Sequence, residues 1–269
     1  MNNIKLKAED LKGNLLKYIF TRIDYEDVIE IQSKTIKKIK NKFPESKIAY
    51  RMLKEQDFSF YDPNPIIELP KEIIETTKCV VIFFKEEDLI VEINQYFTRL
   101  IYKVDREKYN NYKTNIMNKL EGILDIINDE DIKIRRSSIN KIDEAFFGSI
   151  PKMKKIFKSN ILRFNLLNTE MDWTKPSNRL KTETNFGYKD YEANYASIIE
   201  NVRIYEKRYF RIFLSYEVYS KENINSEKDI KTVITNLNKC CDELFISSLT
   251  TTGYKKLKNK ERISEYEVD

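Results

Sequence analysis

Three short acidic stretches are the residues of this sequence best suited to bind a divalent metal ion. They are Glu86-Glu87-Asp88, Asp129-Glu130-Asp131, and Glu68 with Lys71 three residues later. Carboxylates beside a lysine can hold Mg²⁺ and activate water, which is the chemistry of a metal-dependent nuclease. The first two stretches fall where turns are expected, and consecutive carboxylates in a turn usually stay solvated. None has the spacing of a specific nuclease motif, so we assign no metal ligands and no catalytic residues.

The chain has 269 residues and no histidine. This excludes Ser-His-Asp triads, Cys-His dyads, histidine zinc sites and imidazole general bases. Phosphate-binding loops need clustered glycines so that backbone N–H groups can approach the anion. The five glycines are too dispersed to form a phosphate-binding loop, and we expect no cofactor; they are Gly13, Gly122, Gly148, Gly187 and Gly253.

The three cysteines, Cys79, Cys240 and Cys241, fall on or beside apolar positions of expected strands and helices. We interpret them as core residues, because nothing nearby would lower the pKa of a thiol. Their odd number and the vicinal pair argue against structural disulfides and favour a reducing compartment. No apolar run reaches membrane-spanning length and the N-terminus is charged, so we expect a cytoplasmic protein with no membrane contact.

The segment from Ile132 to Arg163 is strongly basic. It has nine positive and two negative residues, whereas the whole chain has a net charge of +5. Phenylalanines interleave with these basic residues, a composition that can bind single-stranded nucleic acid by phosphate contact and base stacking. An acidic protein surface is an equally suitable partner, and a solvated face over core phenylalanines is the structural alternative. The candidate contact residues are Lys133, Arg135, Arg136, Lys141, Lys152, Lys154, Lys155 and Lys158.

A second candidate surface is aromatic. The chain has 17 tyrosines and 15 phenylalanines, and tyrosine is enriched at the energetic centres of protein interfaces. One tyrosine-rich stretch has no clean helical or strand period, which makes it a candidate for docking a protein partner. Its residues, with the single tryptophan, are Trp173, Tyr188, Tyr191, Tyr195 and Tyr205.

Hydrophobic periodicity predicts the elements that position these residues. Alternating and β-branched stretches predict strands, two of them joined as a hairpin by residues 85–88. Apolar residues at spacings of three and four predict amphipathic helices. The expected strands are 15–25, 79–84, 89–102, 131–142, 178–186 and 208–219, and the expected helices are 27–43, 105–128, a short one after Pro151, and 226–249.

From these elements we predict an α+β fold with mostly antiparallel sheets and long amphipathic helices packed on one face. The strand, turn and helix of 89–128 are echoed by those of 209–249, which suggests two duplicated strand-turn-helix halves. We accordingly divide the chain into an N-terminal α+β half, 1–130, and a C-terminal α+β half, 131–254. The charged tail, 255–269, is expected to fray.

The order of elements resembles a sporadically distributed family of uncharacterised prokaryotic proteins of about 250–270 residues. The resemblance lies in Leu16–Tyr25, Asp88–Ile93, Tyr109–Leu124 and Glu243–Leu249, and extends over nearly the whole chain. These motifs are structural, so the resemblance transfers no site residue. The family's Arg-Tyr-Ile/Leu-Asn stretch is matched here only at Ile139 and Asn140. The resemblance implies patchy occurrence, which is often a mark of mobile elements and of defence or counter-defence genes.

Three functions remain open at this point. The leading hypothesis is a non-catalytic binding protein of a mobile-element or phage-conflict system, which docks on a protein or ribonucleoprotein partner. The first alternative is a direct RNA-binding or single-stranded DNA-binding protein. The second is a histidine-free metal-dependent nuclease. The sequence fixes neither the partner nor the oligomeric state.

Overall fold

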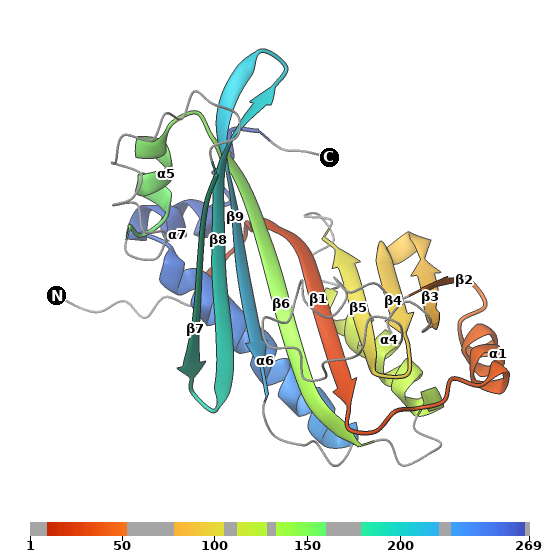
Figure 1. Ribbon diagram of the computed structural model, residues 1–269. Coiled ribbons are helices and arrows are strands. Elements are labelled where there is room, and N and C mark those ends of the chain that lie inside the picture. Colours follow the sequence, from red (N-terminus) through yellow and green to blue (C-terminus); the bar gives the residue numbers. More distant parts are fainter. Residues whose placement is uncertain are drawn as a thin grey trace. The chain divides into compact units, whose positions relative to one another are not determined.

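The computed structural model describes residues 10–52, 78–104, 112–127, 133–159, 179–220 and 227–266 (Figure 1). Its strands form one nine-stranded antiparallel sheet in the order β2-β3-β4-β5-β1-β6-β9-β8-β7. The strands are β1 (Leu16–Tyr25), β2 (Lys47–Met52), β3 (Lys78–Phe84), β4 (Leu89–Ile93), β5 (Phe97–Lys103), β6 (Ile134–Phe147), β7 (Arg179–Tyr188), β8 (Tyr191–Ile204) and β9 (Lys207–Tyr219). The α-helices are α1 (Ser33–Lys42), α4 (Tyr112–Ile127), α5 (Ile150–Ile156), α6 (Glu227–Ser248) and α7 (Thr251–Lys258).

The predicted fold class is wrong. We expected several sheets covered on one face by long helices, whereas the described residues form a single antiparallel sheet in which strand outweighs helix. One cause is the turn inside 89–102, where the Asn94 side-chain oxygen accepts hydrogen bonds from the backbone N–H groups of Tyr96 (2.8 Å) and Phe97 (3.1 Å). An asparagine that bonds the backbone two and three residues ahead favours a turn over a continued strand. The expected single strand is therefore the hairpin β4–β5.

The second cause is β8, which the sequence analysis did not recognise as a strand. Every second residue of its first part is buried, but two of these positions hold the small residues Ala193 and Ser197. The alternation of burial is therefore not an alternation of hydrophobicity. Residues 188–205, which we interpreted as an irregular aromatic stretch, are the end of β7, all of β8 and a following turn.

The chain divides into two compact units. Unit 1 comprises residues 1–18, 141–218 and 236–269, and unit 2 comprises residues 19–140 and 219–235. This division cuts through individual strands, so it does not correspond to successive halves of the sequence. The predicted halves 1–130 and 131–254 stay a prediction.

In unit 1, Tyr216 of β9 anchors helix α6. Its hydroxyl donates a hydrogen bond to the Ser248 hydroxyl (3.0 Å), and its ring meets Phe245 edge-on with 6.1 Å between centroids. The Cys241 sulfur lies 3.5 Å from the Tyr216 carbonyl oxygen. These contacts come from positions one helical turn apart, so the predicted apolar stripe of this helix does face the sheet.

The predicted fraying of the tail is wrong for its described part. Residues 255–258 belong to α7, and Ser264 is buried. The backbone N–H of Glu265 donates to the Phe146 carbonyl oxygen (2.8 Å), and the Tyr266 ring packs edge-on against Phe146. Composition alone predicted a solvated tail because its few apolar and aromatic residues are widely spaced.

In unit 2, Phe43 fixes the C-terminal end of α1. Its ring packs edge-on against Phe84 of β3, with 5.4 Å between centroids. A methyl group at Gly122 of α4 would lie 2.8 Å from the Phe43 ring. Glycine at this position lowers the helix propensity of α4, but it gives the Phe43 ring the space to approach the helix. Lys42 and Lys119 add ion pairs to Asp125 and Glu45, at 2.6 and 2.8 Å.

No helix in the described part of the chain is long and apolar enough to cross a membrane.

Candidate functional site

The candidate residues of the predicted basic segment are divided between the two units. Lys133, Arg135 and Arg136 belong to unit 2, whereas the other five candidates belong to unit 1. Within unit 1, Lys152 forms a 3.1 Å ion pair with Glu265. Lys133, Arg135, Lys152, Lys155 and Lys158 are exposed, and Lys154 is half-buried.

Two residues of that segment are buried, so their assignment as surface contacts is wrong. The Arg136 guanidinium lies 4.0 Å from the centre of the Tyr219 ring, a cation–π contact. Lys141 reaches Asp242 of α6 at 2.5 Å, and its side chain is 4% exposed. Each cation has a partner far away in the sequence, which sequence spacing could not indicate.

The predicted aromatic docking residues also have different environments. Tyr188 is half-buried and donates a hydrogen bond to the Glu243 carboxylate (2.9 Å), and burial together with this bond raises its pKa to about 12. Tyr191 is half-buried, and Tyr195 is buried against Tyr216. Tyr205, in contrast, is 87% exposed at the β8–β9 turn. Trp173 lies outside the described residues.

The predicted acidic stretches give no metal centre in the described residues. Glu86 and Glu87 form a short 3₁₀ turn, and Asp88 follows it with φ 49°, in the left-handed region. Among the residues that the structure describes, no group of three or more metal-binding side chains comes together. Asp129, Glu130 and Asp131, like Glu68 and Lys71, lie outside the described residues.

The three cysteines are buried, and none of them forms a disulfide. Cys79 and Cys241 have no exposed surface, and burial raises the pKa of both Cys240 and Cys241 above the ordinary range. We predict that none of the three reacts with Ellman's reagent in the folded protein at mildly alkaline pH, and that all three react in guanidinium chloride. Fast labelling of one thiol in the folded chain would contradict this.

A basic surface that the sequence analysis missed is formed by helix α1 and strand β2. Residues 33–52 contain seven positive side chains and one negative one, a higher density than in the segment that we singled out. Six of the positive side chains are exposed lysines, and the first turn of α1 has no acidic residue to offset the helix dipole. We call residues 33–52 together with Lys78 the α1–β2 surface. Its exposed lysines are Lys34, Lys37, Lys38, Lys40, Lys42, Lys47 and Lys78.

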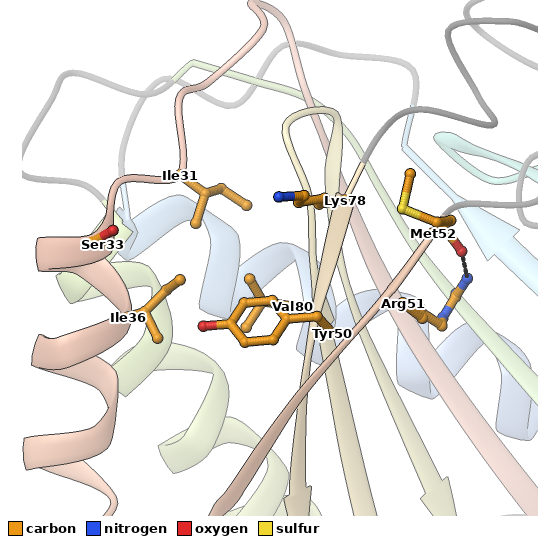
Figure 2. Close-up of a pocket in the computed structure, with 8 residues that line it drawn as sticks. All are labelled: Ile31, Ser33, Ile36, Tyr50, Arg51, Met52, Lys78 and Val80. Carbon is orange, nitrogen blue, oxygen red and sulfur yellow. Dashed lines mark hydrogen bonds between the residues drawn. The ribbon is translucent and has the colours of Figure 1, made fainter.

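A hollow of about 620 Å³ lies within this surface. Figure 2 shows that Tyr50 extends from β2 toward Ile36 of α1, with Val80 of β3 behind its ring. Tyr50 and Met52, which share one face of β2, are 61% and 42% exposed and together form an apolar patch beside the hollow. The residues lining the hollow are Ile31, Ser33, Ile36, Tyr50, Arg51, Met52, Lys78 and Val80.

The outer edge of β2 is open in the described part of the chain. β2 ends the sheet and pairs with β3 alone, from Lys47 opposite Phe83 to Met52 opposite Lys78. An edge strand presents a row of backbone N–H and C=O groups that another chain can bond. Such an edge is suited to binding an extended segment.

A buried ion network holds β2 in place. The Glu92 carboxylate accepts hydrogen bonds at Oε1 from the Arg51 Nε (3.0 Å) and Nη2 (2.9 Å), and at Oε2 from the Arg99 Nε (2.8 Å). The Glu92 and Arg99 side chains are 8% and 5% exposed. This network ties the edge strand across β3 to β4 and β5, and it occupies the Arg51 guanidinium.

Part of this network could have been recognised in the sequence. Glu92 and Arg99 lie on either side of the turn begun by Asn94, and they face each other across the β4–β5 pair. An acid and a base at mirrored positions of a tight hairpin form a cross-strand pair. Recognising this pair depends on knowing that the chain turns at Asn94, and the sequence analysis did not predict that turn.

The sequence matches no known protein family model, and no curated protein matches it. Among solved structures, the chain is similar to Methanococcus jannaschii TBP, with a TM-score of 0.26 and 9% sequence identity. The alignment covers 85% of this chain and 98% of that one. A likeness at this level supports no inference about fold or function.

Proposed function

We propose that this chain is a non-catalytic binding protein that docks on a protein or ribonucleoprotein partner through the α1–β2 surface. The observation behind the proposal is the exposure of Tyr50 and Met52 beside an apolar hollow. Large apolar side chains left in solvent are typical of surfaces that bury them against a partner. The exposed lysines around the hollow would raise the association rate with an acidic partner.

The proposal also includes a biological setting and a cellular location. The setting in a mobile-element or phage-conflict system rests on the sequence resemblance and on no feature of the site. The cytoplasmic location rests on the three cysteines, which form no disulfide and so suit a reducing compartment.

The proposal is tested by photocrosslinking in cells of the source organism. A photoreactive phenylalanine derivative replaces Tyr50 in one variant and Tyr205, a more exposed tyrosine in unit 1, in another. We expect the adduct at position 50 to be degraded by protease and to resist nuclease. The captured protein is then identified and purified for binding measurements.

Charge reversal completes this test. Lys37→Glu combined with Lys40→Glu places two exposed carboxylates on α1, and we expect it to slow association with the purified partner at least tenfold at low salt. Both residues are exposed, so folding should be preserved. Adducts only at position 205 would move docking to the aromatic stretch, and a nuclease-sensitive adduct would favour the nucleic-acid alternative.

A further inference from the structure

We propose that the occupant of the α1–β2 surface is an extended acidic segment of the partner, which adds to the outer edge of β2 as a further strand of the sheet. This inference rests on the proposed function and specifies how the partner is recognised. Three observations on the described residues support it: the open backbone edge, the row of side chains beside it, and the sign of the surrounding charge.

The backbone of β2 favours a strand as the bound conformation. β2 has no proline and bonds β3 along its whole length, so its other edge keeps a regular spacing of donors and acceptors. Edges are usually protected by charged side chains that point along them. On β2 the Arg51 guanidinium is instead turned inward onto Glu92, which leaves Lys47 as the edge's remaining charged side chain.

The side chains of β2 add specificity. Alternate residues of a strand share a face, so Ile48, Tyr50 and Met52 lie on the same side of the sheet. This is also the side of Val80, the register partner of Tyr50 and one of the residues that line the hollow. A strand added beside β2 would place every second side chain next to this row, at cross-strand contact distance. Apolar residues at those positions would cover Tyr50 and Met52.

The positive charge of the α1–β2 surface indicates that the bound segment is negatively charged. Both charged residues that line the hollow are basic, and one of them, Arg51, already has a carboxylate partner. Glu45, the one carboxylate of residues 33–52, pairs with Lys119 at 2.8 Å. Glu26, Asp27 and Glu30 precede α1 in a segment bonded to the carbonyl groups of Gln95 and Lys133. The exposed lysines of α1 and β2 therefore complement an acidic segment in charge.

The strand at the other edge of the sheet, β7, differs from β2 in its charged side chains. On β7, Lys181 and Glu183 form an ion pair of 2.8 Å, and Glu183 also accepts a hydrogen bond from Asn194. The Lys181 hydrogen bond holds the pKa of Glu183 below its ordinary value despite partial burial. The one carboxylate of β7 therefore lies beside a lysine of the same strand, whereas β2 has no acidic residue.

A peptide explains the hollow better than a nucleic acid does. Binding of single strands relies on several aromatic rings for stacking and on guanidinium groups at phosphates. Among the described residues that line the hollow, Tyr50 is the one aromatic, most of the others are apolar, and the one guanidinium, that of Arg51, is bonded to Glu92. Aliphatic side chains of a bound peptide would fit such a hollow.

The inference is tested by selecting random dodecamer peptides against the full chain by display. We expect enriched peptides to combine two or more carboxylates with apolar residues at alternate positions. Fluorescence anisotropy of the best synthetic peptide should show at least a tenfold loss of affinity for Tyr50→Ser and less than a twofold loss for Tyr205→Ser. Lys37→Glu, on the surface of α1, should weaken binding as well, and it provides a second variant if Tyr50→Ser is unstable.

Backbone methylation of the peptide separates strand addition from docking by side chains alone. In a strand, alternate N–H groups point to opposite edges, so only one alternate set can bond β2. N-methylation of that set should abolish binding, and methylation of the other set should leave it nearly unchanged. Equal tolerance of both sets, with Tyr50 still required, would overturn strand addition and leave the proposed function standing.

The remaining outcomes are also decisive. Enriched peptides that bind Tyr50→Ser and Lys37→Glu as tightly as the unchanged chain would overturn both proposals. Failure to enrich any peptide, with Tyr50-dependent binding of a thymidine dodecamer, would replace the peptide by a nucleic acid. Sedimentation that shows a dimer lost in Tyr50→Ser would make a second copy of this chain the occupant.

Discussion

Replacing Glu92 with alanine is expected to lower the free energy of unfolding by about 3–5 kcal/mol. Its carboxylate receives hydrogen bonds from two guanidinium groups, and the Arg99 side chain is almost fully buried. Without the carboxylate, the guanidinium groups of Arg51 on β2 and Arg99 on β5 would lose their shared anion in a region of low dielectric constant. Urea denaturation of the variant and of the unchanged chain measures the difference.

A matched surface ion pair provides the control for this prediction. Glu121 of α4 lies 2.6 Å from Lys231, but the two side chains are 38% and 58% exposed. Glu121→Ala should therefore cost less than about 1 kcal/mol. Similar losses for the two variants would show that the Glu92 network is solvated and does not hold β2 in the sheet.

Replacing Gly253 with alanine is expected to lower the free energy of unfolding by about 1–3 kcal/mol. A Cβ atom at this position would lie 2.4 Å from the Ile156 carbonyl oxygen, a backbone atom that cannot rotate away. The Thr250 hydroxyl also holds α7 close to α5. It accepts a hydrogen bond from the Gly253 N–H (3.0 Å) and donates one to the Lys155 carbonyl oxygen (2.5 Å). Helix α7 therefore has little freedom to move away from α5.

Gly187 of β7 is the control, because a Cβ atom there would meet nothing within 4 Å. Gly187→Ala should leave the stability unchanged or raise it by up to about 1 kcal/mol, since alanine restricts the unfolded chain. Thermal midpoints of the two variants give the comparison. A Gly253→Ala midpoint equal to that of Gly187→Ala would mean that α5 and α7 are not in close contact.

Sequence patterns predicted the elements that have strong periodicity. The expected strands 15–25 and 208–219 are confirmed as β1 and β9, and the expected helix 226–249 as α6, within two residues at each end. Each has apolar residues at the spacing that its burial requires. Strand β8 was missed because Ala193 and Ser197 are buried without being strongly hydrophobic.

The candidate site was only partly accessible to sequence reasoning. A count of charge over residues 33–52 would have identified the lysines of α1, since it needs no structure. The exposure of Tyr50 could not be predicted, because it depends on β2 being an edge strand. The burial of Lys141 likewise depends on Asp242, which is 101 residues away in the chain.

The most direct test of the α1–β2 surface is the affinity of the purified partner for Tyr50→Ser compared with Tyr205→Ser. Both variants remove one exposed tyrosine ring, so they differ in the place of the change and little in its chemistry. We predict a dissociation constant at least ten times larger for Tyr50→Ser than for the unchanged chain. For Tyr205→Ser we predict a change of no more than twofold. Equal affinities for the two variants, or a loss confined to Tyr205→Ser, would contradict docking at this surface.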